Sequence, residues 1–133
     1  MAAILIVDDD DSIRDTLYEL FSEDHLCHAA NTAEVALSFL REQSYDVVLT
    51  DISMPGLSGV ELLSTVRQTQ PSTPVIIISG ISDETHAEGL KRLGAFDYIL
   101  KPFRLQVVES SVARALEYRQ QRKETRPGDE VRS

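Results

Sequence analysis

The chain alternates between two hydrophobic patterns. Short continuous apolar runs, several of them rich in β-branched residues, predict buried strands at residues 4–7, 26–30, 47–49, 75–78 and 96–100. The stretches that follow them repeat apolar residues at helical spacing and predict amphipathic helices, beginning near residues 12, 33, 60, 83 and 105. Strands that alternate with helices through short connections require right-handed crossovers. The pattern therefore predicts an α/β fold with a parallel sheet that helices cover on both faces.

Polar residues mark the ends of several predicted helices. Four consecutive acids, Asp8 to Asp11, lie where the first helix begins, and carboxylates there accept hydrogen bonds from free backbone N–H groups. Asn31 with Glu34 resembles a capping box for the second helix. Gly94 is placed to end the fourth helix. The last helix is expected to fray after Tyr118.

Length and composition bound the organisation of the chain. The 133 residues suit one compact domain over residues 1–120, with a polar tail or linker over residues 121–133. The single cysteine, Cys27, cannot form an internal disulfide, and no secretory signal or membrane-spanning run is present, which predicts a cytoplasmic protein. A net charge of -9 disfavours direct contact with nucleic acids and with anionic membranes.

The candidate chemistry lies directly after the predicted strands, at Asp8, Asp9, Asp51, Ser79 and Lys101. Parallel strands present their carboxyl ends at one edge of the sheet, so these side chains are expected to converge. Acids in contact there would repel each other by about 4 kcal/mol per pair at an effective dielectric constant near 20. A divalent cation removes that repulsion, and oxygen ligands with room for water suit Mg²⁺.

The other members of this group fit phosphoryl transfer. Asp51 offers a carboxylate nucleophile at the mouth of a turn formed by Met54-Pro55-Gly56 and Gly59. Lys101 can neutralise phosphoryl oxygens, and the Ser79 hydroxyl can hydrogen-bond one of them. The combination is much more specific than any one of these residues.

These motifs carry a resemblance to a known family. The matching segments are Asp8-Asp9, Asp51 with Met54-Pro55-Gly56 and Gly59, Ser79-Gly80, and Tyr98-Ile99-Leu100-Lys101-Pro102-Phe103. Over roughly residues 3–120 the chain resembles the receiver domain of two-component response regulators, in the CheY-like superfamily. The resemblance implies a flavodoxin-like, doubly wound (βα)5 sandwich with a five-stranded parallel sheet of order 2-1-3-4-5.

The resemblance also implies the role of each site residue. Asp51 would accept a phosphoryl group from a histidine kinase or a phosphotransfer protein, and Lys101 would pair with the phosphoryl oxygens, beside a cis Lys101-Pro102 bond. Mg²⁺ would be held by Asp8, Asp9 and Asp51, with the backbone carbonyl of Ser53 as a further ligand. Such a chain is a signalling module, which catalyses only its own phosphoryl transfer and autodephosphorylation.

A switch follows from the same resemblance. Ser79 would move toward the phosphoryl group and Tyr98 would turn inward, while Ser53 and Ile81 would tune the phosphoryl lifetime. The remodelled surface of the fourth helix, fifth strand and fifth helix would contact a downstream protein or output domain, and a phosphorylation-dependent homodimer is a further expectation. Gly80 stands where the family often has alanine, which is expected to loosen this loop.

Two other functions compete with this interpretation. Asp8, Asp10 and Ser12 loosely match the nucleophile motif of haloacid dehalogenase-type phosphatases, but that reading leaves Asp51 and its loop unexplained. A receiver that acts as a non-switching scaffold is the second, and the retained acids and Lys101 argue against it. The architecture stays open between a stand-alone regulator and the N-terminal receiver of a longer one.

Several residues also have simpler structural readings. Tyr98 can be a half-buried strand aromatic, and His86 is expected on a helix surface. His25, Cys27 and His28 resemble metal ligands superficially, but side chains alternate between the two faces of a strand, which argues against zinc.

Overall fold

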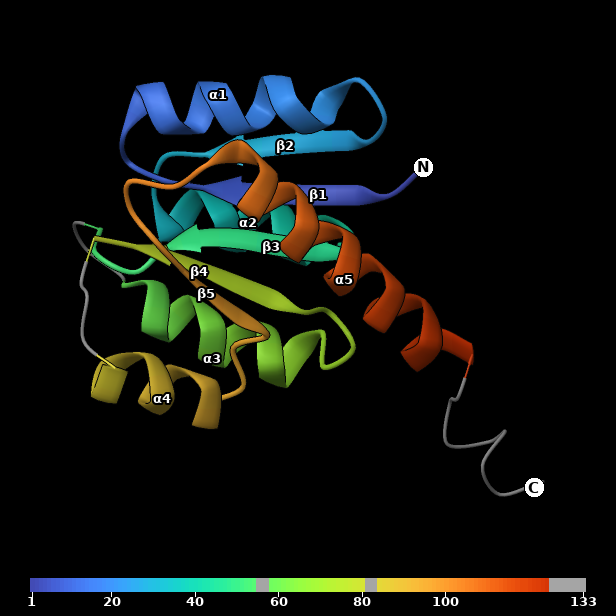
Figure 1. Ribbon diagram of the computed structural model, residues 1–133. Coiled ribbons are helices and arrows are strands. Elements are labelled where there is room, and N and C mark those ends of the chain that lie inside the picture. The colour runs from blue at the N-terminus through green and yellow to red at the C-terminus, as the bar shows by residue number, and fades with distance from the viewer. Residues whose placement is uncertain (55–57, 81–83, 125–133) are drawn as a thin grey trace.

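The computed structural model describes residues 1–54, 58–80 and 84–124. The strands are β1 (Ala3–Val7), β2 (Leu26–Ala30), β3 (Val47–Asp51), β4 (Val75–Ser79) and β5 (Asp97–Leu100). The helices are α1 (Asp11–Ser22), α2 (Ala33–Glu42), α3 (Gly59–Thr69), α4 (Glu84–Arg92) and α5 (Leu105–Glu124). Strands and helices alternate along the chain, as the hydrophobic pattern predicts (Figure 1).

The strands form one parallel sheet in the order β2-β1-β3-β4-β5. Helices α1 and α5 cover one face, and α2, α3 and α4 cover the other (Figure 1). Both the predicted fold class and the predicted strand order are therefore confirmed. The carboxyl ends of the strands lie together at one edge of the sheet.

Two apolar clusters, one on each face, hold the sheet between the helices. On one face, Leu5, Val48 and Ile77 pack with residues of α2, α3 and α4, and on the other, Ile4, Leu49 and Ile76 pack with residues of α1 and α5. Each fully buried aliphatic side chain stabilises the fold by roughly 1.5–3 kcal/mol relative to an exposed one. The central strands β1, β3 and β4 are therefore the most deeply buried part of the sheet.

Helix α3 is tied closely to the strand that precedes it. The Ser58 hydroxyl accepts a hydrogen bond from the Glu61 backbone N–H, and the Glu61 carboxylate accepts one from the Ser58 backbone N–H, so the capping box is complete. The Gly59 N–H donates to the Ile52 carbonyl at 3.2 Å. A Cβ on Gly59 would overlap the Asp51 carbonyl oxygen and lie 2.8 Å from the Ile52 Cα, so only glycine fits this approach.

One detail of the helix ends differs from expectation, and one agrees. The cap of α2 is Thr32, whose side chain accepts from the Val35 N–H, and not Asn31. Thr32 has the extended backbone that a cap requires. Gly94 ends α4 with a φ of +107°, as expected of a glycine at that position.

Helix α5 is longer than predicted. It continues past Tyr118 to Glu124 and so crosses residue 120, where the domain was expected to end. The Tyr118 ring packs on Phe96 at 5.3 Å between centroids, and Arg119 Nε lies 3.6 Å from Asp46 Oδ1. These contacts extend the helix because they attach its second half to the amino end of the sheet. The division into residues 1–120 and 121–133 stays a prediction.

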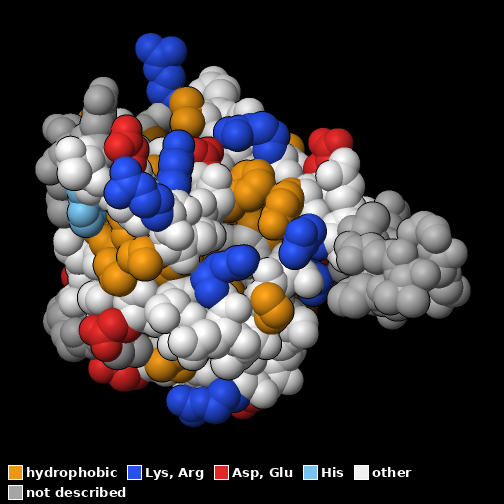
Figure 2. All heavy atoms as spheres, turned by 90° about the horizontal axis from the view of Figure 1, so that it is seen from below, with side chains coloured by type: hydrophobic (Ala, Val, Ile, Leu, Met, Phe, Trp, Pro, Cys, Tyr) orange, Lys and Arg blue, Asp and Glu red, His pale blue; other side chains and the backbone are white. Residues whose placement is uncertain are grey.

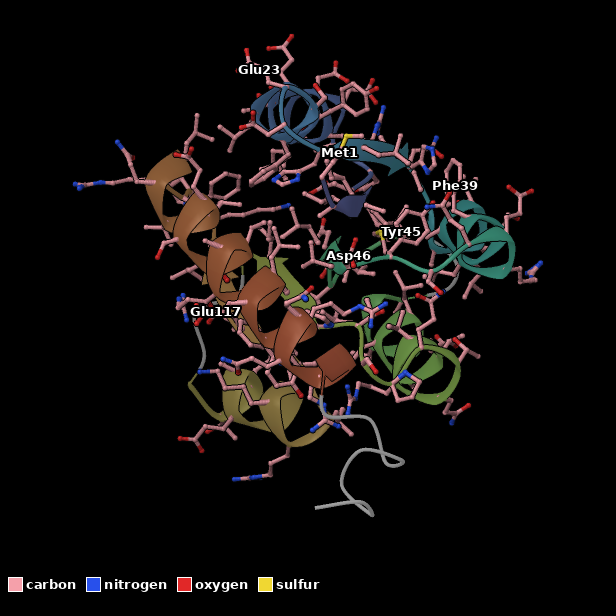
Figure 3. All side chains as sticks on the ribbon, turned by 90° about the vertical axis from the view of Figure 1, so that its right-hand side faces the viewer. Met1, Glu23, Phe39, Tyr45, Asp46 and Glu117 are labelled. Carbon is pink, nitrogen blue, oxygen red and sulfur yellow. The ribbon has the colours of Figure 1, made fainter. Side chains whose placement is uncertain are left out.

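The histidines near Cys27 have partners other than a metal. Cys27 is buried in the cluster of α1 and α5, whereas His28 Nδ1 lies 2.6 Å from the Tyr45 hydroxyl on the opposite face. The His28 ring also stacks on the ring of Phe39 in α2, with 4.9 Å between the ring centroids (Figure 3). His25 Nδ1 accepts from the Ala2 N–H. Within the described residues, no helix is long and apolar enough to cross a bilayer.

Candidate functional site

The predicted site residues meet where the strands end, at the left-hand edge of the sheet in Figure 1. Asp8 follows β1, Asp51 ends β3, Ser79 ends β4 and Lys101 follows β5. The Lys101 N–H donates to the Ser79 carbonyl at 2.7 Å, which continues the pairing of β4 with β5 by one residue. The convergence inferred from a parallel sheet is thereby confirmed for these four positions.

Lys101 bridges the two buried acids. Its Nζ lies 3.1 Å from Asp8 Oδ2 and 3.3 Å from Asp51 Oδ2. Asp8 is 1% exposed and Asp51 is 7% exposed, so this ion pair network is largely shielded from water. The cis Lys101-Pro102 bond that the resemblance implied is present next to it.

Burial and charge act against each other on these groups. Burial raises the pKa of Asp8, while the Asp10 N–H and Lys101 lower it and the charge of Asp51 raises it further. Burial alone would lower the pKa of Lys101, but its hydrogen bond with Asp8 and the charges of Asp8 and Asp51 outweigh that effect and raise it. Lys101 therefore holds a positive charge between the two carboxyl groups at neutral pH.

Backbone donors and an arginine hold the two acids in place. Asp8 Oδ1 accepts from the Asp10 N–H at 2.9 Å, and Asp51 Oδ1 accepts from the Ser53 N–H at 3.2 Å. Arg14 Nη1 donates to the Asp8 carbonyl at 3.0 Å. Sequence reasoning missed Arg14, whose contact with the site depends on how α1 turns back over β1.

The acids form a group with the composition of a metal site. One carboxylate oxygen from each of Asp8, Asp9 and Asp51 lies within 4.8 Å of the others. Asp9 is exposed, so water can reach the group beside the two buried members. An all-oxygen donor set with solvent on one side fits a hard divalent cation. In the described part of the chain, this is the one cluster of acidic, histidine or cysteine side chains with such spacing.

The residues assigned to a switch lie around this site. Ser79 is fully buried, and Tyr98, in the middle of β5, is partly buried against the cluster on the α3 and α4 face. Ser53, two residues after Asp51, is exposed. Ile81 lies outside the described residues. His86, expected on a helix surface, is instead partly buried and faces the Tyr98 ring.

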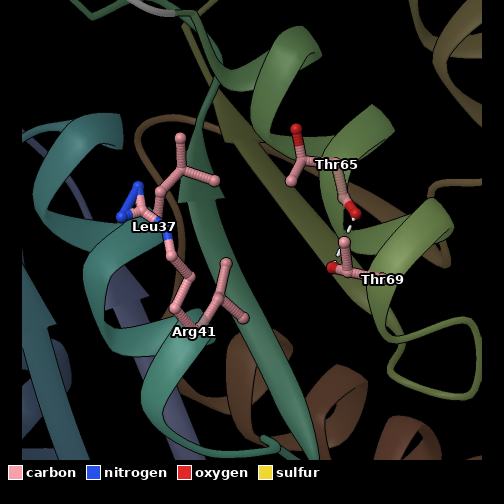
Figure 4. Close-up of a pocket in the computed structure, with 5 residues that line it drawn as sticks. Leu37, Arg41, Thr65 and Thr69 are labelled. Atoms are coloured by element: carbon pink, nitrogen blue, oxygen red, sulfur yellow. Dashed lines mark hydrogen bonds between the residues drawn. The ribbon is translucent and has the colours of Figure 1, made fainter.

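A separate cavity of about 440 Å³ lies between α2 and α3 (Figure 4). Leu37, Leu40 and Arg41 line it from α2, and Thr65 and Thr69 line it from α3. Both threonine hydroxyls donate to carbonyls of their own helix, so the cavity is mainly apolar. It does not include the acidic residues, and its lining offers no carboxylate that could accept a phosphoryl group.

Comparisons with known proteins agree with this fold and with the acidic site. Residues 4–113 match the family model of the response regulator receiver domain. The regulatory protein AtoC of Escherichia coli (strain K12) is 41% identical over 125 residues, which cover 92% of this chain and 27% of AtoC. The chain thus spans about a quarter of the length of this curated relative.

Solved structures show the same fold. A response regulator receiver domain protein from Clostridium thermocellum has a TM-score of 0.84 and 30% identity, covering 90% of this chain and 98% of that one. NtrX from Brucella abortus, solved in complex with ADP, has a TM-score of 0.86 and 35% identity, covering 92% of this chain and 29% of NtrX.

Fold, acidic site and matches define the class of protein: a parallel α/β signalling domain with carboxylates and a lysine at its sheet edge. The chain belongs to the response regulator receiver domain family. It is a phosphorylation-activated receiver of a two-component system, and such a domain works with a histidine kinase or phosphotransfer partner.

Proposed function

We propose that Asp51 is the phosphoryl acceptor of this receiver. The observation that carries the proposal is the Lys101 ammonium, which lies 3.3 Å from Asp51 Oδ2 and is itself held by Asp8 at 3.1 Å. A cation fixed at that point is placed to neutralise the charge that a phosphoryl group brings to Asp51. The Asp51 carboxylate lies at the sheet edge, 7% exposed, where a donor can approach it from one side.

The transfer uses groups of the chain itself. An Asp51 oxygen forms the new bond to phosphorus while the bond from phosphorus to the donor imidazole nitrogen breaks, and the imidazole leaves with that electron pair. Asp8, Asp9, Asp51 and the Ser53 carbonyl would hold Mg²⁺, which supplies charge neutralisation for the transferring phosphoryl oxygens. The Ser53 N–H already orients the Asp51 carboxyl group through Oδ1.

The switch acts through Ser79 and Tyr98. A phosphoryl group adds about -1.5 to -2 charges, and the buried Ser79 hydroxyl would move to hydrogen-bond one of its oxygens. Tyr98 would turn inward as a consequence and change the surface of α4, β5 and α5. The phosphoryl group shifts the population because it interacts better with that arrangement than with the resting one. Ser53 and Ile81 would control access of water to the phosphorylated Asp51.

The changed surface would bind a downstream protein or output domain, or a second phosphorylated copy of the chain. The matched region covers 92% of this chain but only 27% of AtoC and 29% of NtrX. These shares support a role as the receiver portion of a longer regulator. On this proposal the chain acts as a signalling module without a separate substrate. The expected absence of direct nucleic-acid or membrane binding and the cytoplasmic location stay predictions.

Phosphoryl uptake from acetyl phosphate tests the acceptor. With Mg²⁺ present, the wild-type chain should gain one phosphoryl group by intact mass, and peptide mapping should locate it on Asp51. Asp51→Asn should gain none, while the matched control Asp15→Asn, an exposed acid of α1, should behave as wild type. Omitting Mg²⁺ should reduce the uptake strongly, because the carboxylates then have no added counter-charge.

The same mapping of the phosphorylated residue also tests the phosphatase alternative. A phosphoryl group on Asp8, lost in Asp8→Asn, would contradict the receiver mechanism and favour a haloacid dehalogenase-type phosphatase.

For the switch, Lys101→Ala and Ser79→Ala should keep the folded state but lose most of the spectral change that phosphorylation produces. An unchanged response in both variants would refute their assigned roles, whatever the site of phosphorylation.

A further inference from the structure

His86, on α4, is a polar group inside the fold that the phosphoryl chemistry does not use. Its ring meets the ring of Tyr98 edge to face, with 6.0 Å between centroids and 84° between planes. Tyr98 in turn packs against the apolar cluster that includes Leu90 of α4. The α4 helix therefore touches the proposed switch residue through an imidazole, where an apolar ring would make the same contact.

The imidazole carries a buried nitrogen that is not paired. Among the described residues, His86 Nε2 is inaccessible to solvent and has no hydrogen-bond partner. The only other side-chain atom of this kind in that part of the chain is Arg119 Nε, which has the Asp46 carboxylate 3.6 Å away. A buried polar atom without a partner has lost its bonds to water and gained nothing in exchange. The docked position of α4 is therefore less stable than the contact area suggests.

The rest of α4 is loosely attached as well. Of its residues with described side chains, only Leu90 is buried. Gly89 is a weak helix former, and a Cβ there would meet nothing within 4 Å. A cavity of about 310 Å³ lined by Val60, Thr85, His86, Gly89, Leu90 and Leu93 separates part of α4 from α3. Figure 2 shows this face, where apolar side chains are exposed between basic ones. The helix thus has room to shift.

We propose that His86 is a positioning residue for the switch, which holds the Tyr98 ring in its resting place while its unpaired nitrogen keeps α4 weakly docked. An apolar ring at this position would make the same edge contact without the unpaired nitrogen, and would hold α4 and Tyr98 too firmly to respond. A small side chain would release both. The role in signalling rests on the proposed phosphorylation of Asp51, whereas the effect on α4 does not.

Three variants of the full chain separate these contributions. His86→Phe keeps a ring against Tyr98 and removes the nitrogen, and His86→Ala removes both. Lys91→Ala, an exposed position of α4, is the matched control for a change of side chain on this helix. By hydrogen exchange of the resting protein, we expect the α4 amides to slow by about threefold or more in His86→Phe and to speed up similarly in His86→Ala. The control should remain near wild type.

The NMR signal of the Tyr98 ring is the second measurement. Its response to activation would not change if His86 had a purely structural role. The chain has 4 tyrosines, so ring-labelled tyrosine yields few NMR signals, and Tyr98→Phe assigns the relevant one. Beryllofluoride with Mg²⁺ serves as the phosphoryl mimic. We expect the wild-type Tyr98 signal to shift on its addition, and the shift in His86→Phe to fall to less than half. In His86→Ala, the resting signal should already lie toward the activated position.

The outcomes are distinguishable from those for the acceptor. If wild-type chain takes up phosphoryl on Asp51 but both His86 variants match Lys91→Ala in exchange and in the Tyr98 signal, the role of His86 is wrong. Changed exchange with an unchanged Tyr98 response would also overturn it, since His86 would then be structural only. Absence of phosphoryl uptake by the wild type would refute the proposed function, while the exchange of α4 would still test its attachment by His86.

Discussion

Helices α3 and α4 lie side by side on the same face of the sheet and are similar in length, with 11 and 9 residues, yet they are attached very differently (Figure 1). Helix α3 begins with a complete capping box and buries four residues, Gly59, Leu62, Leu63 and Val66. Helix α4 buries Leu90 alone among its described side chains. Attachment thus depends on burial and end contacts, since the two lengths differ little.

The difference matters because each helix follows a strand that ends in a site residue. Helix α3 follows β3, which ends in Asp51, and its first residue presses against the Asp51 and Ile52 backbone. Helix α4 follows β4, which ends in Ser79, and contacts Tyr98 through His86. The proposed acceptor Asp51 therefore lies next to a closely packed helix, α3, while the proposed switch residue Tyr98 contacts a loosely packed one, α4.

The largest effect is expected from Gly59→Ala. Its Cβ would overlap the Asp51 carbonyl oxygen, and backbone on both sides leaves no flexible group to move away. We expect the unfolding free energy to fall by about 3 kcal/mol or more, with loss of phosphoryl uptake as Asp51 is displaced. Urea denaturation measures the first and acetyl phosphate labelling the second. A loss below about 1 kcal/mol would contradict the tight attachment of α3.

Gly94→Ala tests the end of α4. Gly94 has a φ of +107°, which is unfavourable for alanine, while the nearest contact of its Cβ would be the flexible Arg67 side chain at 2.7 Å. The backbone conformation therefore dominates, and we expect a loss of about 1–2 kcal/mol by urea denaturation. Arg67→Ala in the same background relieves the side-chain contact. If this second change restored full stability, the cause would be crowding by Arg67 and not the backbone angle.

Removing the cap of α3 should have a smaller effect. Ser58→Ala deletes the hydroxyl that accepts from the Glu61 N–H, which should lower the unfolding free energy by about 1 kcal/mol. Ser64→Ala, at an exposed position inside α3, is the matched control and should change little. Equal losses in the two variants would show that the capping box adds nothing to the attachment of this helix.

Gly89→Ala should be the one stabilising change of the series. It makes the same chemical change as Gly59→Ala, but its Cβ meets nothing within 4 Å, so only helix propensity acts. We expect a gain of about 0.5–1 kcal/mol in unfolding free energy and a smaller response of α4 to beryllofluoride. A loss of stability on this substitution would mean that α4 packs more closely than its surroundings indicate.

Most of the fold was predictable because it follows local patterns. The apolar runs located each strand to within two residues, and Gly94 marked the end of α4. The site was predictable for the same reason, since Asp8, Asp51, Ser79 and Lys101 each lie at the end of a recognisable strand. Topology then brings them together without any further information from the side chains.

Apart from the local shift of the α2 cap from Asn31 to Thr32, the errors came from contacts between distant segments. Tyr118 and Arg119 extend α5 because they meet Phe96 and Asp46, and no local pattern reveals those partners. His86 sits on a short, polar helix, which indicated exposure, and its contact with Tyr98 depends on how α4 docks. In each case a side chain that looks solvated along the sequence is recruited by a neighbour that folding supplies.

The single thiol of Cys27 can serve as a probe of how often this fold opens. It is 5% exposed in the cluster of α1 and α5, on the opposite face from α4, and burial raises its pKa to about 11. A thiol reagent should modify it only when the sheet itself opens, because the reactive thiolate is otherwise scarce and covered. The labelling rate would then depend on the opening of the whole fold and would not respond to movements of α4.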